Sequence, residues 1–478
     1  MYFLRSVFPL FIGLIFFTSL SAQELISIEY KGQRSQEQLA ADYGFLIQNG
    51  VERYKITYTT PDVFGQLDTA SGLIVLPVRE ETTIYPLLVY QHGTVDGPQD
   101  VPSNLQGGYQ LAEVFGGLGY VSLAPDYLGA GEARGFHPYV HRESEASAAV
   151  DMIRAVRGYA PDMDLLLNDQ LFITGYSQGG HASMALHQTV ELELADEMEV
   201  TAASHLSGPY SISGVMRNVM ISDEPYNFLA YLPNTYLSYN YVYDFYDDIE
   251  QFFKPAYVTA IRNFYEGNIG LGNLNNFLIN SITQEHGAPI ARYMLQDSIV
   301  AILEAGDPNH PVIQALEDND TYEWAPQKPT RIFYCMADDQ VFFRNSVVAD
   351  SVMQELGAVD LVTTDVLSEA DHGGCVEPAV INTALFFNNF ADWTVNTDDL
   401  ANSLPLKVYP NPVEGWMQIE GIESDADVQL FNQQGKLVWN ARLGVGAQQL
   451  NLPSLPAGVY LLRVEAAEGR ATRKLIIQ

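Results

Sequence analysis

Basic residues are scarce in this chain. It holds 24 lysines and arginines against 59 aspartates and glutamates in 478 residues, a formal net charge of −35. Nucleic acids and anionic membrane surfaces repel such a polyanion, which argues against either as a partner. Only 17% of the residues are charged and 47% are hydrophobic, a balance typical of globular proteins. The length predicts two or more domains.

Long apolar runs are also missing beyond the first residues, so no later segment is expected to span a membrane. Near the N-terminus, Arg5 precedes the apolar run SVFPLFIGLIFFTSLSA. That run is shorter than the roughly 20 residues of a membrane-spanning helix, and small residues follow it. We predict a signal peptide over residues 1–22, cleaved near Ala22, although Leu20 fits the −3 position imperfectly. A buried N-terminal helix is the alternative.

Strand and helix patterns alternate along most of the chain. Apolar runs predict strands at residues 54–60, 72–78, 85–93, 120–127, 170–176, 200–208, 330–337 and 359–367. Apolar residues at helical spacing predict helices over 142–158, 179–194 and about 377–392. Such alternation predicts an α/β fold, with a mostly parallel sheet and helices on both of its faces.

Residues 209–328 interrupt this alternation. They contain no clear strand, they show helical patterns over 247–265 and 289–305, and aromatic residues crowd the stretch from Tyr226 to Phe253. Connections of this length inside a compact sheet usually have secondary structure of their own. We therefore predict a helical cap inserted between two strands, whose aromatic rings either form its core or line an apolar pocket.

Residues 404–478 form a second interruption. Alternating strands separated by turns, as in VQLFNQQGKLVWN (428–440), predict a small all-β sandwich. This segment carries seven basic and seven acidic residues, so the excess of negative charge lies entirely upstream of it. Residues 394–403 are the predicted linker, and residues 23–393 form the predicted larger domain.

A serine stands between two glycines at the end of one predicted strand, in the motif GYSQG. Gly175 and Gly179 lie two residues either side of Ser177, and the helix predicted over 179–194 follows. A strand, a sharp turn and a helix in this order make a nucleophile elbow, which exposes a reactive hydroxyl. Small residues that let a helix pack closely on a sheet are the alternative explanation.

A serine hydroxyl needs a base to act as a nucleophile, usually a histidine that a carboxylate orients. His372 lies in a short polar loop after the last predicted strand, and Asp338 and Asp339 follow the strand before it. The carboxyl ends of parallel strands carry the functional groups of such sheets. All three residues are therefore candidates to meet Ser177.

Taken together, these motifs make residues 50–392 resemble the α/β-hydrolases, and within them the secretory lipase and esterase families. The matching segments occur in the order of that family: YQHGT (90–94), APDYLGAGEARGFHPYV (124–140), GYSQGG (175–180), ADDQV (337–341) and ADHGG (370–374). The resemblance implies the α/β-hydrolase fold with an inserted helical cap, and it implies no cofactor.

The resemblance also implies a catalytic triad. Ser177 would be the nucleophile, His372 the base and Asp338 the acid, with Asp339 as the alternative acid. Asp338 is preferred because the family pattern has an apolar residue three positions after the acid, where this chain has Val341.

Two backbone N–H groups would hold the oxyanion that forms when the serine attacks. One belongs to Gln178, which follows the nucleophile at the start of a helix. The other is expected from Thr94 in the loop after YQHG, although this loop departs from the HGGG loop of some lipases.

Several polar residues outside the expected triad are expected to stabilise the fold and to take no part in the chemistry. Asp126, His137 and His141 lie in a loop with Gly129 and Gly131. That loop could bind a metal, but the resemblance implies a structural role, and we predict no metal site. His181 is expected to pack locally behind the elbow. His205 lies on an apolar strand and is expected to be a satisfied core histidine.

Only two cysteines occur, Cys335 and Cys375. An exported protein can hold a disulfide, and two buried thiols are the alternative. Cys335 precedes Asp338 by three residues and Cys375 follows His372 by three. If that acid and base touch, we expect the cysteines to bond and to hold both catalytic loops.

The C-terminal segment 404–478 resembles the type A sorting domain of the type IX secretion system. The matching stretches are LKVYPNPVEG (406–415), LFNQQGKLVWN (430–440), LPAGVYLLRV (455–464) and RKLIIQ (473–478). The resemblance implies the secretion machinery as a partner and passage through the periplasm to the cell surface or the medium. A carbohydrate-binding module or a stability domain is the alternative.

The expected function is therefore that of a secreted serine hydrolase. It would cleave carboxylic esters, small or lipid-like, through an acyl-enzyme. A serine peptidase of the same fold, similar to an aminopeptidase, is one alternative, and a non-catalytic surface binding protein is another. Peptidases of this fold usually carry an N-terminal propeller, for which too few residues precede the first strands.

Overall fold

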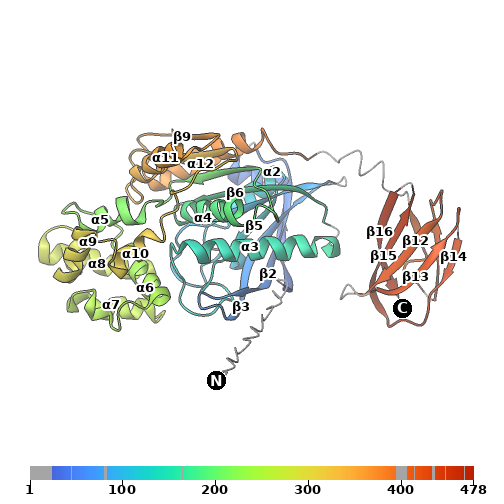
Figure 1. The fold of residues 1–478 in the computed structure, drawn as a ribbon, viewed down its shortest axis with the longest axis horizontal. Coiled ribbons are helices and arrows are strands. Elements are labelled where there is room, and N and C mark those ends of the chain that lie inside the picture. The colour runs from blue at the N-terminus through green and yellow to red at the C-terminus, as the bar shows by residue number, and fades with distance from the viewer. Residues whose placement is uncertain are drawn as a thin grey trace, which may run out of the picture. The chain divides into compact units, whose positions relative to one another are not determined.

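A computed structural model describes residues 24–44, 46–79, 83–163, 165–393, 406–413, 415–432, 437–446, 448–467 and 469–477. The chain divides into two compact units, Met1–Trp393 and Thr394–Gln478 (Figure 1). The predicted signal peptide (1–22) and the predicted linker (394–403) lie outside the described residues.

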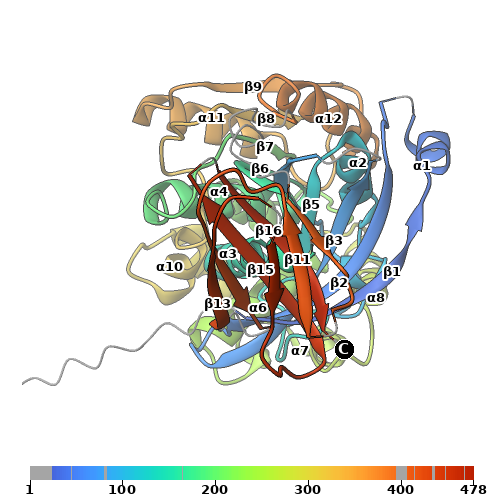
Figure 2. The ribbon, with the colours of Figure 1, turned by 90° about the vertical axis from the view of Figure 1, so that its right-hand side faces the viewer.

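A nine-stranded sheet forms the centre of the first unit, in the order β1-β2-β3-β5-β4-β6-β7-β8-β9 (Figure 2). Its strands are β1 (Leu25–Arg34), β2 (Gly50–Pro61), β3 (Leu67–Val78), β4 (Tyr85–Gln91), β5 (Val121–Pro125), β6 (Leu167–Tyr176), β7 (Ala202–Leu206), β8 (Thr330–Tyr334) and β9 (Leu361–Asp365). Neighbours run antiparallel from β1 to β5 and parallel from β5 to β9. Each strand predicted from an apolar run corresponds to an observed strand.

Helices cover both faces of this sheet. They are α1 (Gln36–Tyr43), α2 (Gln110–Leu118), α3 (Arg142–Tyr159), α4 (Gln178–Glu193), α11 (Arg344–Leu356) and α12 (His372–Phe387). Successive residues of β6 point to opposite faces: Leu171 and Ile173 pack into the core that contains α3 and α4, whereas Phe172 packs with α2 and α12. Buried on both faces, the strands appear in the sequence as continuous apolar runs.

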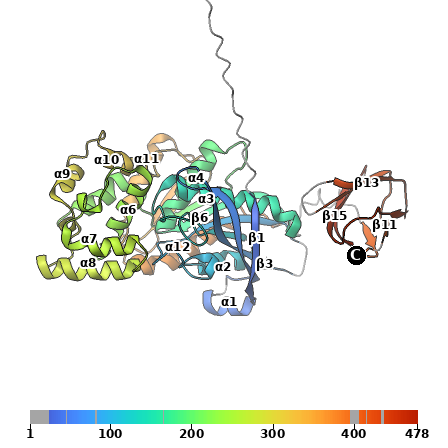
Figure 3. The same ribbon diagram turned by 90° about the horizontal axis from the view of Figure 1, so that it is seen from below.

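Between β7 and β8 the chain forms a cluster of helices with a hydrophobic core of its own. These helices are α5 (Arg217–Ile221), α6 (Tyr231–Tyr243), α7 (Pro255–Tyr265), α8 (Leu271–His286), α9 (Asp297–Ala305) and α10 (Pro311–Glu317). Figure 3 shows them gathered at one end of the unit, and we call this cluster the cap. Tyr236, Tyr239, Phe252 and Phe253 are buried in its core, so these rings serve packing.

Several helices around the sheet differ from the sequence-based expectations. Helices α1, α2 and α11 match no predicted helix, and Ser35 and Gln38 form a capping box at the start of α1. Helix α12 begins at His372 and not near residue 377, so His372 lies in the first turn of a helix and not in a loop. The side chain of Asp371 caps this turn by accepting the N–H of Gly374 at 2.8 Å, which offsets the weak helix propensity of the glycines.

The second unit consists of two small antiparallel sheets. Its strands are β10 (Lys407–Tyr409), β11 (Trp416–Glu420), β12 (Ala426–Phe431), β13 (Leu437–Leu443), β14 (Gln448–Asn451), β15 (Gly458–Ala466) and β16 (Gly469–Ile477). They are arranged as β10-β11-β14 and β13-β12-β15-β16. Ile419 from one sheet and Val428 and Leu462 from the other share one buried core, so the unit is a small β-sandwich.

Candidate active site

Ser177 occupies a strained turn between β6 and α4. Its backbone angles are φ 63° and ψ −123°, a combination that costs free energy for any residue with a side chain. The turn is possible because its glycines have no Cβ atom. A Cβ on Gly175 would lie 2.0 Å from the carbonyl oxygen of Gly179, and one on Gly179 would lie 1.9 Å from that of Gln91. The strand, the turn and the helix together form the sharp elbow that the sequence predicted.

The structure brings His372 and Asp338 together. Nδ1 of His372 lies 2.7 Å from Oδ2 of Asp338, and both side chains are almost fully buried. The other oxygen of Asp338, Oδ1, accepts the backbone N–H groups of Gln340 at 3.0 Å and Val341 at 2.8 Å. The carboxylate is thus held by the turn that follows it, with one oxygen left to orient the imidazole.

Asp339 contacts a different part of the same histidine. Its Oδ1 accepts the backbone N–H of His372 at 3.2 Å, at the start of α12. An acidic side chain at a helix N-terminus also interacts favourably with the helix dipole. Asp339 therefore supports the helix that carries His372, while Asp338 faces its ring.

Tyr176 links His372 to the end of the strand that carries Ser177. Its hydroxyl donates to the backbone carbonyl of His372 at 2.5 Å, and the two rings lie 4.9 Å apart between centroids. Burial raises the pKa of the Tyr176 hydroxyl, so it remains a donor at neutral pH. Since Tyr176 and Ser177 are adjacent in the chain, this contact brings the start of α12 close to the elbow.

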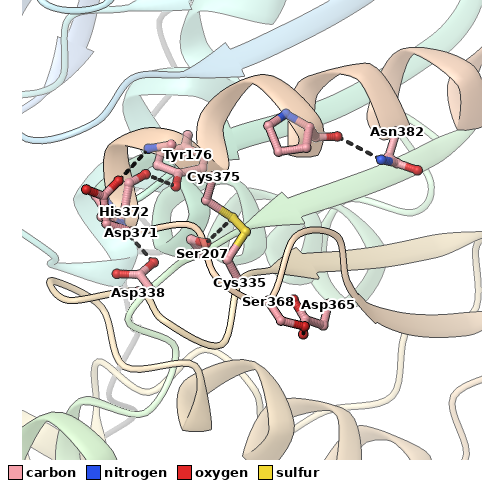
Figure 4. The surroundings of a disulfide bond; sticks show 12 residues. Tyr176, Ser207, Cys335, Asp338, Asp365, Ser368, Asp371, His372, Cys375 and Asn382 are labelled. Atoms are coloured by element: carbon pink, nitrogen blue, oxygen red, sulfur yellow. Dashed lines mark hydrogen bonds and ion pairs between the residues drawn. A yellow bond between two sulfur atoms is a disulfide. The ribbon is translucent and has the colours of Figure 1, made fainter.

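Cys335 and Cys375 form a disulfide, as expected from the sequence, with their Cα atoms 5.9 Å apart. Figure 4 shows the bond beside His372 and Asp338. It joins the end of β8, three residues before Asp338, to the first turn of α12. The segments that carry the two partners are therefore covalently connected.

The loop after β4 lies against the elbow. A Cβ on Gly93 would lie 3.6 Å from Cβ of Ser177, an ordinary contact distance, so the backbone of this loop passes close to the serine. The next residue, Thr94, shares a 3.0 Å hydrogen bond between its hydroxyl and that of Tyr139. His92 directly precedes Gly93 in the chain, and burial lowers the pKa of its ring to about 4, which keeps this histidine neutral. Thr94 is thus near Ser177, where the sequence predicted an oxyanion donor.

Gln178 begins α4 directly after Ser177. The serine side chain does not cap this helix, so the first N–H groups of α4 face the region of the elbow with the positive end of the helix dipole. The side chain of Gln178 turns inward and donates from Nε2 to Nε2 of His137 at 2.9 Å and to Oε1 of Glu145 at 2.8 Å.

His181 and His205, the two histidines expected to have structural roles, have hydrogen-bond partners of their own. Nδ1 of His181 lies 2.7 Å from Oε2 of Glu145, and its Nε2 lies 2.8 Å from the backbone carbonyl of Asn319. His205 is buried between the hydroxyl of Ser183 at 2.8 Å and the ring of His187 at 3.2 Å. Both therefore have local contacts, as the sequence predicted.

The loop that follows β5 is held by internal hydrogen bonds. Asp126 accepts the hydroxyl of Ser71 at 2.6 Å and the backbone N–H of Ser103 at 2.9 Å, and burial raises its pKa. Within the residues that the structure describes, no group of three or more His, Cys, Asp or Glu side chains could hold a metal ion.

Two cap tyrosines contact the turn that carries Asp338. Tyr226 donates to the backbone carbonyl of Gln340 at 2.8 Å, and Tyr231 donates to its side-chain oxygen at 2.9 Å. Burial raises the pKa of Tyr231 to about 12. The cap and the segment of the proposed acid are therefore joined by hydroxyl groups.

Sequence reasoning missed Tyr176, Gln340 and Glu145. A signal existed for Glu145, because it lies four residues before Ala149 and extends the apolar stripe of α3. A carboxylate on such a stripe needs a buried partner. Nothing comparable in the sequence marks Tyr176 or Gln340.

The order of the strands, the helices on both faces and the elbow after β6 define the fold of the first unit as that of the α/β-hydrolases. Similar solved structures include a "putative hydrolase" from Legionella pneumophila, with 24% identity, a TM-score of 0.69, and coverage of 77% of this chain and 98% of that one. The rice cell wall degrading esterase LipA from Xanthomonas oryzae has 24% identity and a TM-score of 0.64, over 77% and 95% of the two chains. Lipase A from Candida antarctica has 14% identity and a TM-score of 0.53, over 75% and 82%. No curated protein matches the sequence.

Residues 407–478 match the family of secretion system C-terminal sorting domains. The β-sandwich is therefore a sorting domain of the type IX secretion system, as the sequence predicted. Such domains mark proteins for export to the cell surface or the extracellular space, and this protein is assigned to that location. In the part of the chain that the structure describes, no helix has the length and hydropathy needed to cross a bilayer.

Proposed function

We propose that this protein is a secreted serine hydrolase that cleaves carboxylic esters through Ser177, His372 and Asp338. One observation carries the proposal: the chain combines a serine in a strained elbow after β6 with a histidine–aspartate pair after β8 and β9, whose Nδ1 and Oδ2 lie 2.7 Å apart. A buried carboxylate that orients an imidazole is the arrangement that converts a serine hydroxyl into a nucleophile.

The proposed reaction begins when the Ser177 hydroxyl attacks the ester carbonyl and passes its proton to Nε2 of His372. Asp338 stabilises the imidazolium that results. The oxyanion accepts hydrogen bonds from the backbone N–H groups of Gln178 and Thr94. His372 then protonates the leaving alcohol, which leaves an acyl group on the serine. A water molecule, deprotonated by His372, releases the acid and restores the hydroxyl.

Ester cleavage is preferred over other reactions of this fold because two of the similar structures are named as an esterase and a lipase. That support is at the level of the fold, which hosts many reactions. The same triad would serve a peptidase, so the substrate bond needs a direct test.

A fluorophosphonate probe tests the nucleophile, because it forms a covalent bond only with an activated serine. We expect the wild-type protein to be labelled and Ser177→Ala to remain unlabelled. Labelling of both proteins would exclude Ser177, and labelling of neither would favour a binding protein.

Substrate panels then define the bond. Nitrophenyl esters from acetate to palmitate measure esterase activity and its dependence on acyl length, and aminoacyl nitroanilides measure peptidase activity. We expect hydrolysis of the esters and at most slow hydrolysis of the anilides. Faster cleavage of the anilides would replace the esterase assignment with a peptidase.

A further inference from the structure

A buried hydrogen-bond network lies behind the elbow and is not used by the proposed reaction. It connects Gln178, Glu145 and His181, whose side chains come from the first turns of α3 and α4. The side chains of Glu145 and His181 are 0% exposed, and Gln178 as a residue is 1% exposed. Most polar groups at such depth have hydrogen-bond partners, so the partners indicate where the protons lie.

Both ring nitrogens of His181 face oxygen atoms of other residues. Nδ1 lies 2.7 Å from a carboxylate oxygen of Glu145, and Nε2 lies 2.8 Å from the backbone carbonyl of Asn319. Beside an ionised Glu145, a neutral imidazole with its one N–H would direct a lone pair at one of these acceptors. An imidazolium donates to both, and the negative charge of Glu145 compensates its positive charge.

The second oxygen of Glu145 holds the side chain of Gln178. Oε1 accepts from Nε2 of Gln178 at 2.8 Å, and the same Nε2 donates to Nε2 of His137 at 2.9 Å. His137 presents a lone pair there, because its Nδ1 donates to the carbonyl of Leu128 at 2.9 Å. Burial also lowers the pKa of His137, in keeping with a neutral ring.

The orientation of the Gln178 amide is therefore determined by its neighbours. Rotating the amide by 180° would place its oxygen against the carboxylate of Glu145 and the lone pair of His137. The observed orientation leaves Oε1 of Gln178 buried without a partner among the described residues. The protein retains this unpaired oxygen, which indicates that the two donated bonds outweigh its cost.

We propose that Glu145 and His181 form a buried carboxylate–imidazolium pair that positions the backbone N–H of Gln178 for the oxyanion. This proposal rests on the proposed function, in which that N–H is one of two oxyanion donors. Glu145 and His181 act through Gln178, so they are positioning residues and not catalytic ones. Because Asn319 follows α10, the pair also connects the end of the cap to the elbow.

Two substitutions of Glu145 separate the hydrogen bond from the charge. In Glu145→Gln the new amide oxygen accepts from Gln178 while its NH₂ group donates to Nδ1 of a neutral His181, so every bond is kept. In Glu145→Leu the side chain of Gln178 loses this acceptor. Removing an oxyanion donor costs about 10²–10³-fold in kcat, so partial misplacement is expected to cost about 10–100-fold.

We therefore expect Glu145→Leu to lower kcat for a nitrophenyl ester by about 10–100-fold with KM changed by less than about twofold, and Glu145→Gln to retain kcat within about threefold. Asp151 offers a matched control, because it lies on the same helix, is also buried, and binds Thr60 and Arg154 away from the elbow. Asp151→Leu is expected to lower thermal stability and to leave kcat unchanged.

The protonation state of His181 can be measured by NMR, independently of enzymatic activity. In protein labelled with ¹⁵N-histidine, we expect both nitrogens of His181 to be protonated at neutral pH in the wild type, and only one in Glu145→Gln. An unprotonated nitrogen in wild-type His181 would overturn the ion pair, even if no variant folds. Equal loss of kcat in Glu145→Gln and Glu145→Leu, or no loss in either, would overturn the positioning role. Failure of the wild type to hydrolyse esters would instead overturn the proposed function.

Discussion

Nδ1 of His372 lies 2.7 Å from Oδ2 of Asp338, whereas the adjacent Asp339 reaches only the backbone N–H of the same histidine, at 3.2 Å. Two consecutive carboxylates thus bind two different parts of one residue. One faces the ring and can orient it and stabilise its charge. The other accepts the first backbone N–H of the helix that begins at His372.

This division predicts different consequences for the two carboxylates. We expect Asp338→Asn to lower kcat for ester hydrolysis by about 10²–10⁴-fold, because the imidazole loses the anion that orients it. Asp339→Asn is expected to cost less than about tenfold, since the side-chain oxygen of an asparagine can still accept the N–H of His372. The two variants should be compared in steady-state kinetics with matched circular dichroism spectra. A larger loss in Asp339→Asn would reverse the assignment of the acid.

Ser177→Ala and His372→Ala are each expected to lower kcat by more than about 10³-fold while the fold is kept. Members of a triad act as a unit, so the double variant should be little worse than either single variant. Kinetics at saturating ester, with thermal unfolding as the control for folding, would test this. Losses that multiply in the double variant would show that one residue is misassigned.

The disulfide is expected to contribute to stability and to the geometry of the His372–Asp338 pair. Cys335 and Cys375 are 40 residues apart in the chain, and cross-links over loops of this size typically stabilise a protein by about 2–4 kcal/mol. The double variant Cys335→Ser/Cys375→Ser should therefore unfold at a lower temperature. Peptide mapping without reductant should recover the two cysteines joined in the native exported protein; free, alkylated thiols there would contradict the bond.

The raised pKa of Asp320 leads us to expect that the stability of the protein depends on pH. It follows α10, it accepts the backbone N–H and the hydroxyl of Ser213 after β7, and burial raises its pKa from 3.8 to about 6. Between these values the folded state binds a proton that the unfolded state has released. The contribution of Asp320 to stability is therefore complete below pH 3.8 and is lost as the pH rises to about 6.

The variant Asp320→Asn removes this titration and can keep both bonds to Ser213. We expect the melting temperature of the wild type to decline more between pH 4 and pH 7 than that of Asp320→Asn, which controls for all other titrating groups. Parallel curves for the two proteins would contradict a raised pKa at Asp320.

The sorting domain is expected to direct export and to take no part in catalysis. A protein truncated to residues 23–398 should fold and hydrolyse esters at close to the full rate when made in a foreign host. In the native host it should accumulate as active enzyme in the periplasm, and the exported full-length protein should lose its tail. Normal export of the truncated protein would contradict the sorting role. Normal export with loss of binding to a polymer would point to a carbohydrate-binding module.

The sequence by itself determined the architecture of this protein. Apolar strands buried on both faces appear as continuous runs, and the helices between them show their own period, so the α/β alternation is visible locally. The GYSQG motif predicts the elbow, because only glycine allows the backbone approach of Gly175 and Gly179. The order of the motifs was sufficient to predict the fold, and the sorting pattern at the C-terminus was sufficient to predict the location of the protein.

Only the tertiary structure decided which groups meet. Asp338 and Asp339 are indistinguishable as carboxylates, and the turn that binds Oδ1 of Asp338 determines which one faces His372. The start of α12 depended on a cap at Asp371 that overrides the weak helix propensity of its glycines. Glu145 and His181 are 36 residues apart, and no local pattern records that two helices bring them to 2.7 Å. Local sequence patterns encode periodicity and turn chemistry, whereas contacts between distant segments follow from how the elements pack against one another.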